Sequence, residues 1–209
     1  VRLKETQIES RTIVLAEDVT TSTLERLRIE RERDYDLLTG LYNRRAFYRF
    51  AGRLFDRPDK MKHAAVVMMD LDNLKRTNDT FGHEWGDRYI HEAAVCFLRN
   101  IPDGTLCARV SGDEFNILFC GYDSREAVQR AIDRLVSGVE NSHFNLPDGQ
   151  ATRIHVSGGI AWYPEDGTEL MELIKCADFA MYQMKRNEKG RFGVFDRKQY
   201  NQTEGDMSR

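Results

Sequence analysis

Residues 106–120, with the sequence LCARVSGDEFNILFC, decide the fold of this chain. Residues 106–110 and 115–120 are rich in the apolar side chains that favour short strands. The four residues between them, Ser111-Gly112-Asp113-Glu114, are small or polar and predict a hairpin turn. Because two strands joined by so short a turn run antiparallel, a purely parallel sheet is excluded.

Strands and helices alternate on both sides of this hairpin. Residues 64–70, AAVVMMD, form a continuous apolar run that ends in a carboxylate, which predicts a buried strand. Apolar side chains at helical spacing then follow at 85–99, and again after the hairpin at 128–139. This order predicts an α+β fold with a ferredoxin-like β-α-β-β-α-β core, in which helices flank a mainly antiparallel central sheet. The remaining predicted elements are a strand at 152–162, a helix at 170–181 and a strand at 192–195.

Composition narrows the class of protein. The 209 residues are 41% hydrophobic and 31% charged, which excludes wholesale disorder. Lys and Arg number 31 against 34 Asp and Glu, for a net charge of −3. A nucleic-acid polymer is therefore not expected as a partner, because phosphate-backbone binding requires a basic excess. A nucleotide is still allowed, since it needs only a few cations and a metal.

Cysteine usage and hydropathy indicate the compartment. The four cysteines lie among apolar residues without a CxxC pattern, as buried free thiols do, so we expect a reducing, cytoplasmic location. No apolar run approaches the ~20 residues of a membrane span. The chain begins with Val, so we expect it to be a piece of a longer protein. That longer protein could be anchored in a membrane.

Three segments are predicted along the chain. Residues 1–33 contain a short strand at 12–15 and a mostly polar helix at 24–33, the pattern of a connector or of half a coiled coil. Residues 34–196 form the main domain. Residues 197–209 are expected to be a loose polar tail.

Two acidic clusters are the first candidates for chemistry. Asp70 and Asp72 end the buried strand, and alternation places them on one face of it. Asp113 and Glu114 lie in the turn of the neighbouring hairpin. Carboxylates from two elements, completed by substrate phosphates, are the usual ligands of Mg²⁺. A solvated strand end and a solvated turn are the alternative explanation.

The stretch that follows Asp72 adds groups suited to a nucleotide. Lys75 can reach a phosphate as a point charge, and Asn78 and Asp87 carry the amide and carboxylate that pair with a guanine edge. Gly82 and Gly86 permit close approach of the backbone.

Five motifs in this order resemble the GGDEF domain of bacterial diguanylate cyclases, and the resemblance covers about residues 34–196. The residues that carry it are DLLTGLYNRR at 36–45, DLDNLKRTNDTFGHEWGD at 70–87, RVSGDEF at 109–115, VSGGIA at 156–161 and ADFAMY at 177–182.

The resemblance implies a nucleotidyl-cyclase-like fold and a definite reaction. Such enzymes condense two GTP molecules into cyclic di-GMP and release two pyrophosphates, with one GTP held by each subunit of a homodimer. By motif position, Asp70, the Leu71 carbonyl and Asp113 would bind two divalent cations, Mg²⁺ or alternatively Mn²⁺. Glu114 or Asp113 would deprotonate the attacking hydroxyl, and the choice stays open because a metal ligand and a base make competing demands on one carboxylate.

The resemblance also assigns the substrate contacts. Lys75 would stabilise charge on the phosphates as a catalytic group. The implied binding residues are Asn78, Asp87 and His83 at the guanine, Gly112 at the backbone approach, and Lys185 with Arg191 or Lys189 at the phosphates.

Three departures from the family pattern stand out. Ser111 replaces the first Gly of the signature, and we expect this change to be tolerated. Pro102-Asp103-Gly104-Thr105 occupies the positions of the family's RxxD feedback site, so product inhibition through that site is not expected. The segment from Lys185 to Gly190-Arg191 is two residues longer than usual, which leaves Lys189 and Arg191 as rivals for one role.

Two functions are therefore compared. An active diguanylate cyclase explains why the acidic and basic motif residues are retained, and a degenerate module that binds GTP or a protein partner is the alternative. Residues 12–20 and the charged helix after them resemble the end of a PAS-type sensor, which implies an upstream sensor domain as a partner.

Overall fold

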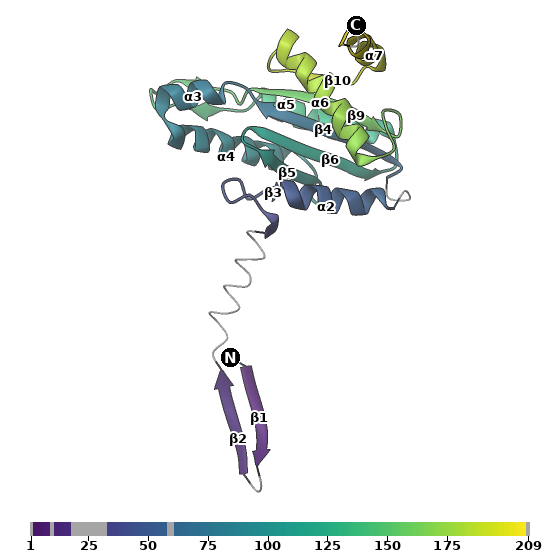
Figure 1. Ribbon diagram of the computed structural model, residues 1–209. Helices are drawn as coiled ribbons and strands as arrows, with labels where there is room; N and C mark the ends of the chain where they lie inside the picture. Colours follow the sequence, from purple (N-terminus) through teal and green to yellow (C-terminus); the bar gives the residue numbers. More distant parts are fainter. Residues whose placement is uncertain (1, 9–10, 18–32, 58–60, 208–209) are drawn as a thin grey trace. The chain divides into compact units, whose positions relative to one another are not determined.

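The computed structural model describes residues 2–8, 11–17, 33–57 and 61–207 (Figure 1). The chain divides into two compact units, residues 1–35 and 36–209. The first unit contains an antiparallel hairpin of β1 (Arg2–Ile8) and β2 (Arg11–Glu17). β2 includes the strand predicted at 12–15, whereas the sequence pattern does not anticipate β1. The predicted helix at 24–33 lies, apart from Arg33, outside the described residues.

The second unit is built on a six-stranded sheet with the order β10-β9-β4-β6-β5-β3. The four inner strands pair antiparallel throughout, whereas β10 and β3 pair parallel at the two edges. The strands are β3 (Tyr42–Asn43), β4 (His63–Leu71), β5 (Leu106–Ser111), β6 (Glu114–Tyr122), β9 (Val156–Tyr163) and β10 (Phe192–Val194).

The ferredoxin-like prediction is confirmed by the inner strands. Sequence order β4, β5, β6, β9 becomes spatial order β9-β4-β6-β5, because the first strand inserts between the hairpin and the last strand. The predicted hairpin is β5–β6, with a turn at Gly112-Asp113. The sheet as a whole is mixed, since short edge strands join it in parallel.

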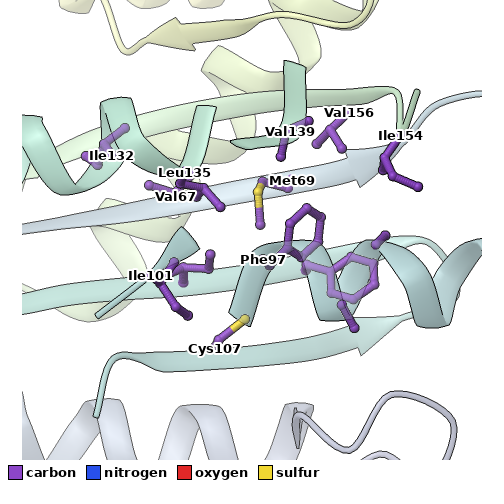
Figure 2. Packing of buried hydrophobic residues seen from close by; sticks show 14 of the residues in the cluster. Val67, Met69, Phe97, Ile101, Cys107, Ile132, Leu135, Val139, Ile154 and Val156 are labelled. Atoms are coloured by element: carbon purple, nitrogen blue, oxygen red, sulfur yellow. The ribbon is translucent and has the colours of Figure 1, made fainter. Parts of the chain in front are cut away.

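Helices cover both faces of the sheet (Figure 1). Side chains of β4 alternate between two apolar clusters: Val67 and Met69 pack with α4 and α5, and Val66 and Met68 with α2 and α6. Figure 2 shows part of the first cluster, where Phe97 packs beneath Met69. The helices are α2 (Arg44–Phe55), α3 (Leu74–Phe81), α4 (His83–Asn100), α5 (Arg125–Glu140), α6 (Leu170–Asn187) and α7 (Arg197–Met207).

The predicted strand at 152–162 is shorter than expected and is preceded by a separate small sheet. That sheet consists of β7 (Phe144–Asn145) and β8 (Ala151–Thr152) in an antiparallel pair. The strand itself, β9, starts at Val156.

The prediction of a loose tail from residue 197 is wrong. Residues 197–207 form α7, and the Tyr200 ring on this helix packs edge-on against Phe179 of α6 with ring centroids 5.1 Å apart. Tyr200 also contacts Phe195, at 5.6 Å between centroids. An aromatic side chain therefore helps to anchor a mostly polar helix, which is why composition alone did not reveal it.

Candidate active site

The carboxyl end of β4 places two carboxylates in the interior. Asp70 and Asp72 are each only 5% exposed. Asp70 lies opposite Ser157 in the β4–β9 ladder, and the Asp72 Oδ2 atom accepts a hydrogen bond of 2.8 Å from the hydroxyl of the same Ser157. Both carboxylates thus reach the α6 side of the sheet, as strand alternation predicts.

Asp70 has an unusual electrostatic environment. Burial raises the pKa of its carboxyl to about 6, the hydrogen bond from Lys185 opposes this shift, and the negative charge of Asp113 reinforces it. Lys185 Nζ on α6 lies 2.5 Å from Asp70 Oδ2. Asp70 is therefore a buried anion that already attracts one cationic group.

The β5–β6 turn meets the end of β4. The Leu71 amide donates a 3.0 Å hydrogen bond to the Asp113 carbonyl, and Glu114 lies directly opposite Asp70 in the β4–β6 ladder. Arg109 donates to the Gly112 carbonyl from Nε at 2.9 Å and from Nη2 at 2.8 Å. The turn is thereby fixed from both sides, with the acidic side chains of β4 and β6 on adjacent strands.

Arg109 also connects this turn to the start of the domain. Its Nη1 atom lies 3.3 Å from the Asp36 carboxylate, whose Oδ1 atom accepts further hydrogen bonds from the Thr39 amide and hydroxyl. Burial alone would raise the pKa of Asp36, but the Thr39 hydrogen bonds and the Arg109 charge outweigh it and hold the pKa below its usual value.

A cavity of about 500 Å³ opens where these elements meet. Among the predicted site residues it brings together Asp70, Leu71, Lys75, Asp113 and Lys185. Sequence reasoning did not propose Arg76 and Asp79 for this site. Asp79 lies one helical turn after Lys75 on α3, so i,i+4 spacing was the signal that could have found it. The cavity is lined by Asp70, Leu71, Asp72, Asn73, Leu74, Lys75, Arg76, Asp79, Asp113, Lys185 and Lys189.

The donor set fits a divalent cation that is completed by a ligand. Across the described ranges, no group of three His, Cys, Asp or Glu side chains is arranged to hold a metal by itself. Asp70 and Asp113 supply two carboxylates to one cavity, beside the backbone of Leu71. Mg²⁺ keeps open positions for water and phosphate oxygens, so an incomplete protein cage of hard oxygen donors suits it.

The predicted guanine-binding residues form a second group, at the junction of α3 and α4. Gly82 has a φ of +88° and separates the two helices, which lets the chain turn sharply there. The Asn78 side chain packs against Gly86, where a Cβ atom would collide with it. His83 and Asp87 are exposed on α4 one turn apart, and Asp87 directly follows Gly86 in the sequence. None of the three lines the cavity beside Asp70.

The segment after α6 places Lys189 and Arg191, the two candidates for one phosphate contact, in different surroundings. Lys189 lines the cavity, whereas Arg191 Nη1 lies 3.3 Å from Glu188 Oε2 in an exposed pair. Gly112 is exposed, and a Cβ built on it would meet nothing within 4 Å. The predicted substrate roles of Gly112 and Arg191 therefore stay predictions.

Comparisons with known proteins agree on one family. The family described as "Diguanylate cyclase, GGDEF domain" matches residues 33–191. Signaling protein YkoW of Bacillus subtilis is 32% identical over 87% of this chain and 23% of its own length. Probable diguanylate cyclase DgcE of Escherichia coli is 30% identical over 90% of this chain and 17% of its own length. Cyclic di-GMP phosphodiesterase PdeR, from the same species, is 34% identical over 82% of this chain and 25% of its own length. The chain thus spans about a quarter or less of these relatives.

Solved structures give the same result. The GGDEF domain of TpbB, also called YfiN, from Pseudomonas aeruginosa is 30% identical, with a TM-score of 0.70, and the match covers 78% of this chain and 94% of that one. The coiled coil and GGDEF domain of DgcB from Caulobacter crescentus, solved with c-di-GMP, is 26% identical, with a TM-score of 0.69. The match covers 84% of this chain and 95% of that one. Within the described parts of the chain, no helix is long and apolar enough to cross a membrane.

Proposed function

The chain belongs to the GGDEF domain family, and from this membership we propose that it is a diguanylate cyclase that condenses two GTP into cyclic di-GMP. One observation carries the proposal: Asp70, Asp113 and two lysines, Lys75 and Lys185, line a single cavity. A triphosphate with its divalent cation requires this combination of hard oxygen donors and positive charges.

The metal would be held by Asp70, Asp113 and the Leu71 carbonyl. When bound, Mg²⁺ or Mn²⁺ neutralises charge on the phosphate oxygens and helps to align the reacting groups. Lys75 at the start of α3, and Lys185 and Lys189, which line the same cavity, would bind the phosphates as point charges.

The reaction forms and breaks one bond at each phosphate. The ribose 3′-hydroxyl of one GTP attacks the α-phosphate of the other; a new P–O bond forms and the bond to pyrophosphate breaks. A second, reciprocal attack closes the ring and releases the second pyrophosphate. Each hydroxyl proton passes to a carboxylate. Glu114 is our choice as base, because Asp113 lines the cavity beside Asp70 as a metal ligand would.

The base of GTP would be recognised at the α3–α4 junction. Asn78 and Asp87 offer an amide and a carboxylate to the guanine edge, and His83 lies one turn before Asp87 on the same helix. Because one site holds one GTP, the reaction requires a homodimer with two sites facing each other. We also propose a cytoplasmic setting, in which residues 1–33 connect the domain to an upstream sensor.

A second function is supported by one relative. The similarity to a protein named as a cyclic di-GMP phosphodiesterase allows a GGDEF domain that binds GTP without turning it over. The retained Asp70, Asp113 and Lys75 favour turnover, because a pure binding module has no need for paired carboxylates at a phosphate site.

Product analysis distinguishes the two functions. The protein is incubated with GTP and Mg²⁺, and the nucleotides are separated by chromatography and identified by mass. A cyclase forms cyclic di-GMP and two pyrophosphates per product, and a chelator stops the reaction until Mg²⁺ is restored. GTP that is bound but unchanged in a dimeric sample would establish the second function instead.

A further inference from the structure

Ser111 is the residue at which this chain departs from the family signature, and its side chain makes a specific contact. Its Oγ atom donates a 2.6 Å hydrogen bond to Glu114 Oε2. Such a short O–H···O⁻ distance is typical of a charge-assisted hydrogen bond. In the described part of the chain this is the one hydrogen bond or ion pair made by the Glu114 carboxylate.

The register of the hairpin makes this contact possible. The β5–β6 ladder shifts between Arg109 and Ser111, so that Ser111 pairs with Glu114 across a turn of only two residues. Side chains of directly opposed residues lie on the same face, within reach of each other. The two hydrogen bonds from Arg109 to the Gly112 carbonyl fix the turn that closes this pair.

The surroundings of Glu114 explain why a donor matters there. Asp70 lies directly opposite it on β4, and like charges in that position repel. Asp178 on α6 also repels Glu114: burial, and then the negative charge of Glu114, raise the pKa of Asp178. Lys185 is occupied by Asp70. The Ser111 hydroxyl is thus the group that opposes displacement of Glu114 by its acidic neighbours.

We propose that Ser111 is a positioning residue that orients the Glu114 carboxylate for proton abstraction. The inference rests on the proposed cyclase function, and it assigns a role that glycine at this position cannot perform, because glycine has no side chain to donate. Ser111 acts through Glu114 and needs no contact with GTP. Its loss should therefore slow turnover without weakening substrate binding.

The test compares Ser111→Ala, Ser111→Gly and Ser111→Thr with the unmodified protein. Loss of a hydrogen bond to a charged group corresponds to a decrease in kcat of about tenfold for Ala and Gly. Threonine keeps the hydroxyl and should retain most of kcat. The KM for GTP, and the Kd of a non-hydrolysable GTP analogue with Mg²⁺, should stay within about twofold in every variant, since the hydrogen bond reaches neither base nor phosphate.

Ser124→Ala is the matched control. Ser124 Oγ accepts a 3.2 Å hydrogen bond from the Ala127 amide at the start of α5, so this variant also loses a hydroxyl contact. It should lower the melting temperature and leave kcat unchanged. Wild-type kcat in Ser111→Ala, or a Thr variant as slow as Ala, overturns the role of Ser111. Absence of turnover in the unmodified dimer overturns the proposed function itself, and the role of Ser111 with it.

Discussion

Lys185 and Asp70 join helix α6 to the end of the central strand β4, with 2.5 Å between Nζ and Oδ2. The Asp70 side chain is 7% exposed and that of Lys185 is 33% exposed. The carboxylate is therefore enclosed, whereas the ammonium keeps contact with water. Because both residues line the cavity, the pair links stability of the domain to the chemistry of the site.

Removal of the lysine charge should destabilise the domain. In Lys185→Met, Asp70 stays enclosed without its counter-ion, and we expect the free energy of unfolding to fall by about 2 kcal/mol, below the range for fully buried pairs. Urea denaturation measures the loss. The double variant Asp70→Asn/Lys185→Met should recover much of it, because no buried charge is then left alone. Equal losses in the single and double variants would show that the ion pair is not responsible.

Substitution of Gly86 should impair recognition of GTP. The Cβ atom of Gly86→Ala would occupy the place of the Asn78 side chain, which we propose to bind guanine. We expect the KM for GTP to rise about tenfold, the scale of one lost bidentate contact, with a smaller change in kcat. Gly52→Ala is the control, since a Cβ there meets nothing within 4 Å in helix α2. An unchanged KM in Gly86→Ala would remove Asn78 from the guanine site.

Acid should weaken the link between Asp36 and Arg109. The folded-state pKa of Asp36 lies below its usual value, so its ionised form stabilises the domain above about pH 4, the ordinary range of an aspartate. This contribution is lost as the pH falls through the lower, folded-state pKa. Melting temperatures of the unmodified protein and Asp36→Asn should differ clearly at pH 6 and converge toward ~pH 3. A gap that is constant over this range would contradict the assignment.

Helix α7 should contribute to stability but not to turnover. Tyr200→Ala removes the ring that packs on Phe179 and Phe195, and we expect a loss of roughly 1–2 kcal/mol in unfolding free energy, with kcat unchanged. Lys198→Ala, at an exposed position on the same helix, should change neither. Thermal denaturation and a turnover assay measure both quantities. A stable Tyr200→Ala protein would show that α7 does not dock through this ring.

The sequence predicted the inner sheet because its signals are local and strong. The apolar run of β4 and the polar turn at Gly112-Asp113 determine the direction and pairing of the inner strands. The position of Asp70 beside the β5–β6 hairpin follows from that pairing. The short strands β3, β7 and β8 were missed, since two residues carry no periodic signal. Helix α7 was missed because it is mostly polar and docks through a few tertiary contacts.

The site was predictable in part. Asp70, Asp113, Lys75 and Lys185 line one cavity, whereas the roles that the motifs imply for them stay predictions. The choice between Lys189 and Arg191 depended on the path of a lengthened loop, which residue types do not reveal. The Ser111–Glu114 hydrogen bond depended on a register shift within β5–β6, and no single-residue pattern encodes such a shift.

We propose above all that the cavity beside Asp70 converts GTP into cyclic di-GMP. The most direct test is the rate of cyclic di-GMP formation from GTP and Mg²⁺ by the unmodified protein and by two variants, Asp113→Asn and Asp103→Asn. Asp103 is an exposed aspartate before β5. We predict product from the unmodified protein and Asp103→Asn at similar rates, and a decrease of at least ~10³-fold in Asp113→Asn, as expected when a charge that supports metal catalysis is removed. Equal rates in Asp113→Asn and the unmodified protein, or no cyclic di-GMP from any of the three, would contradict the claim.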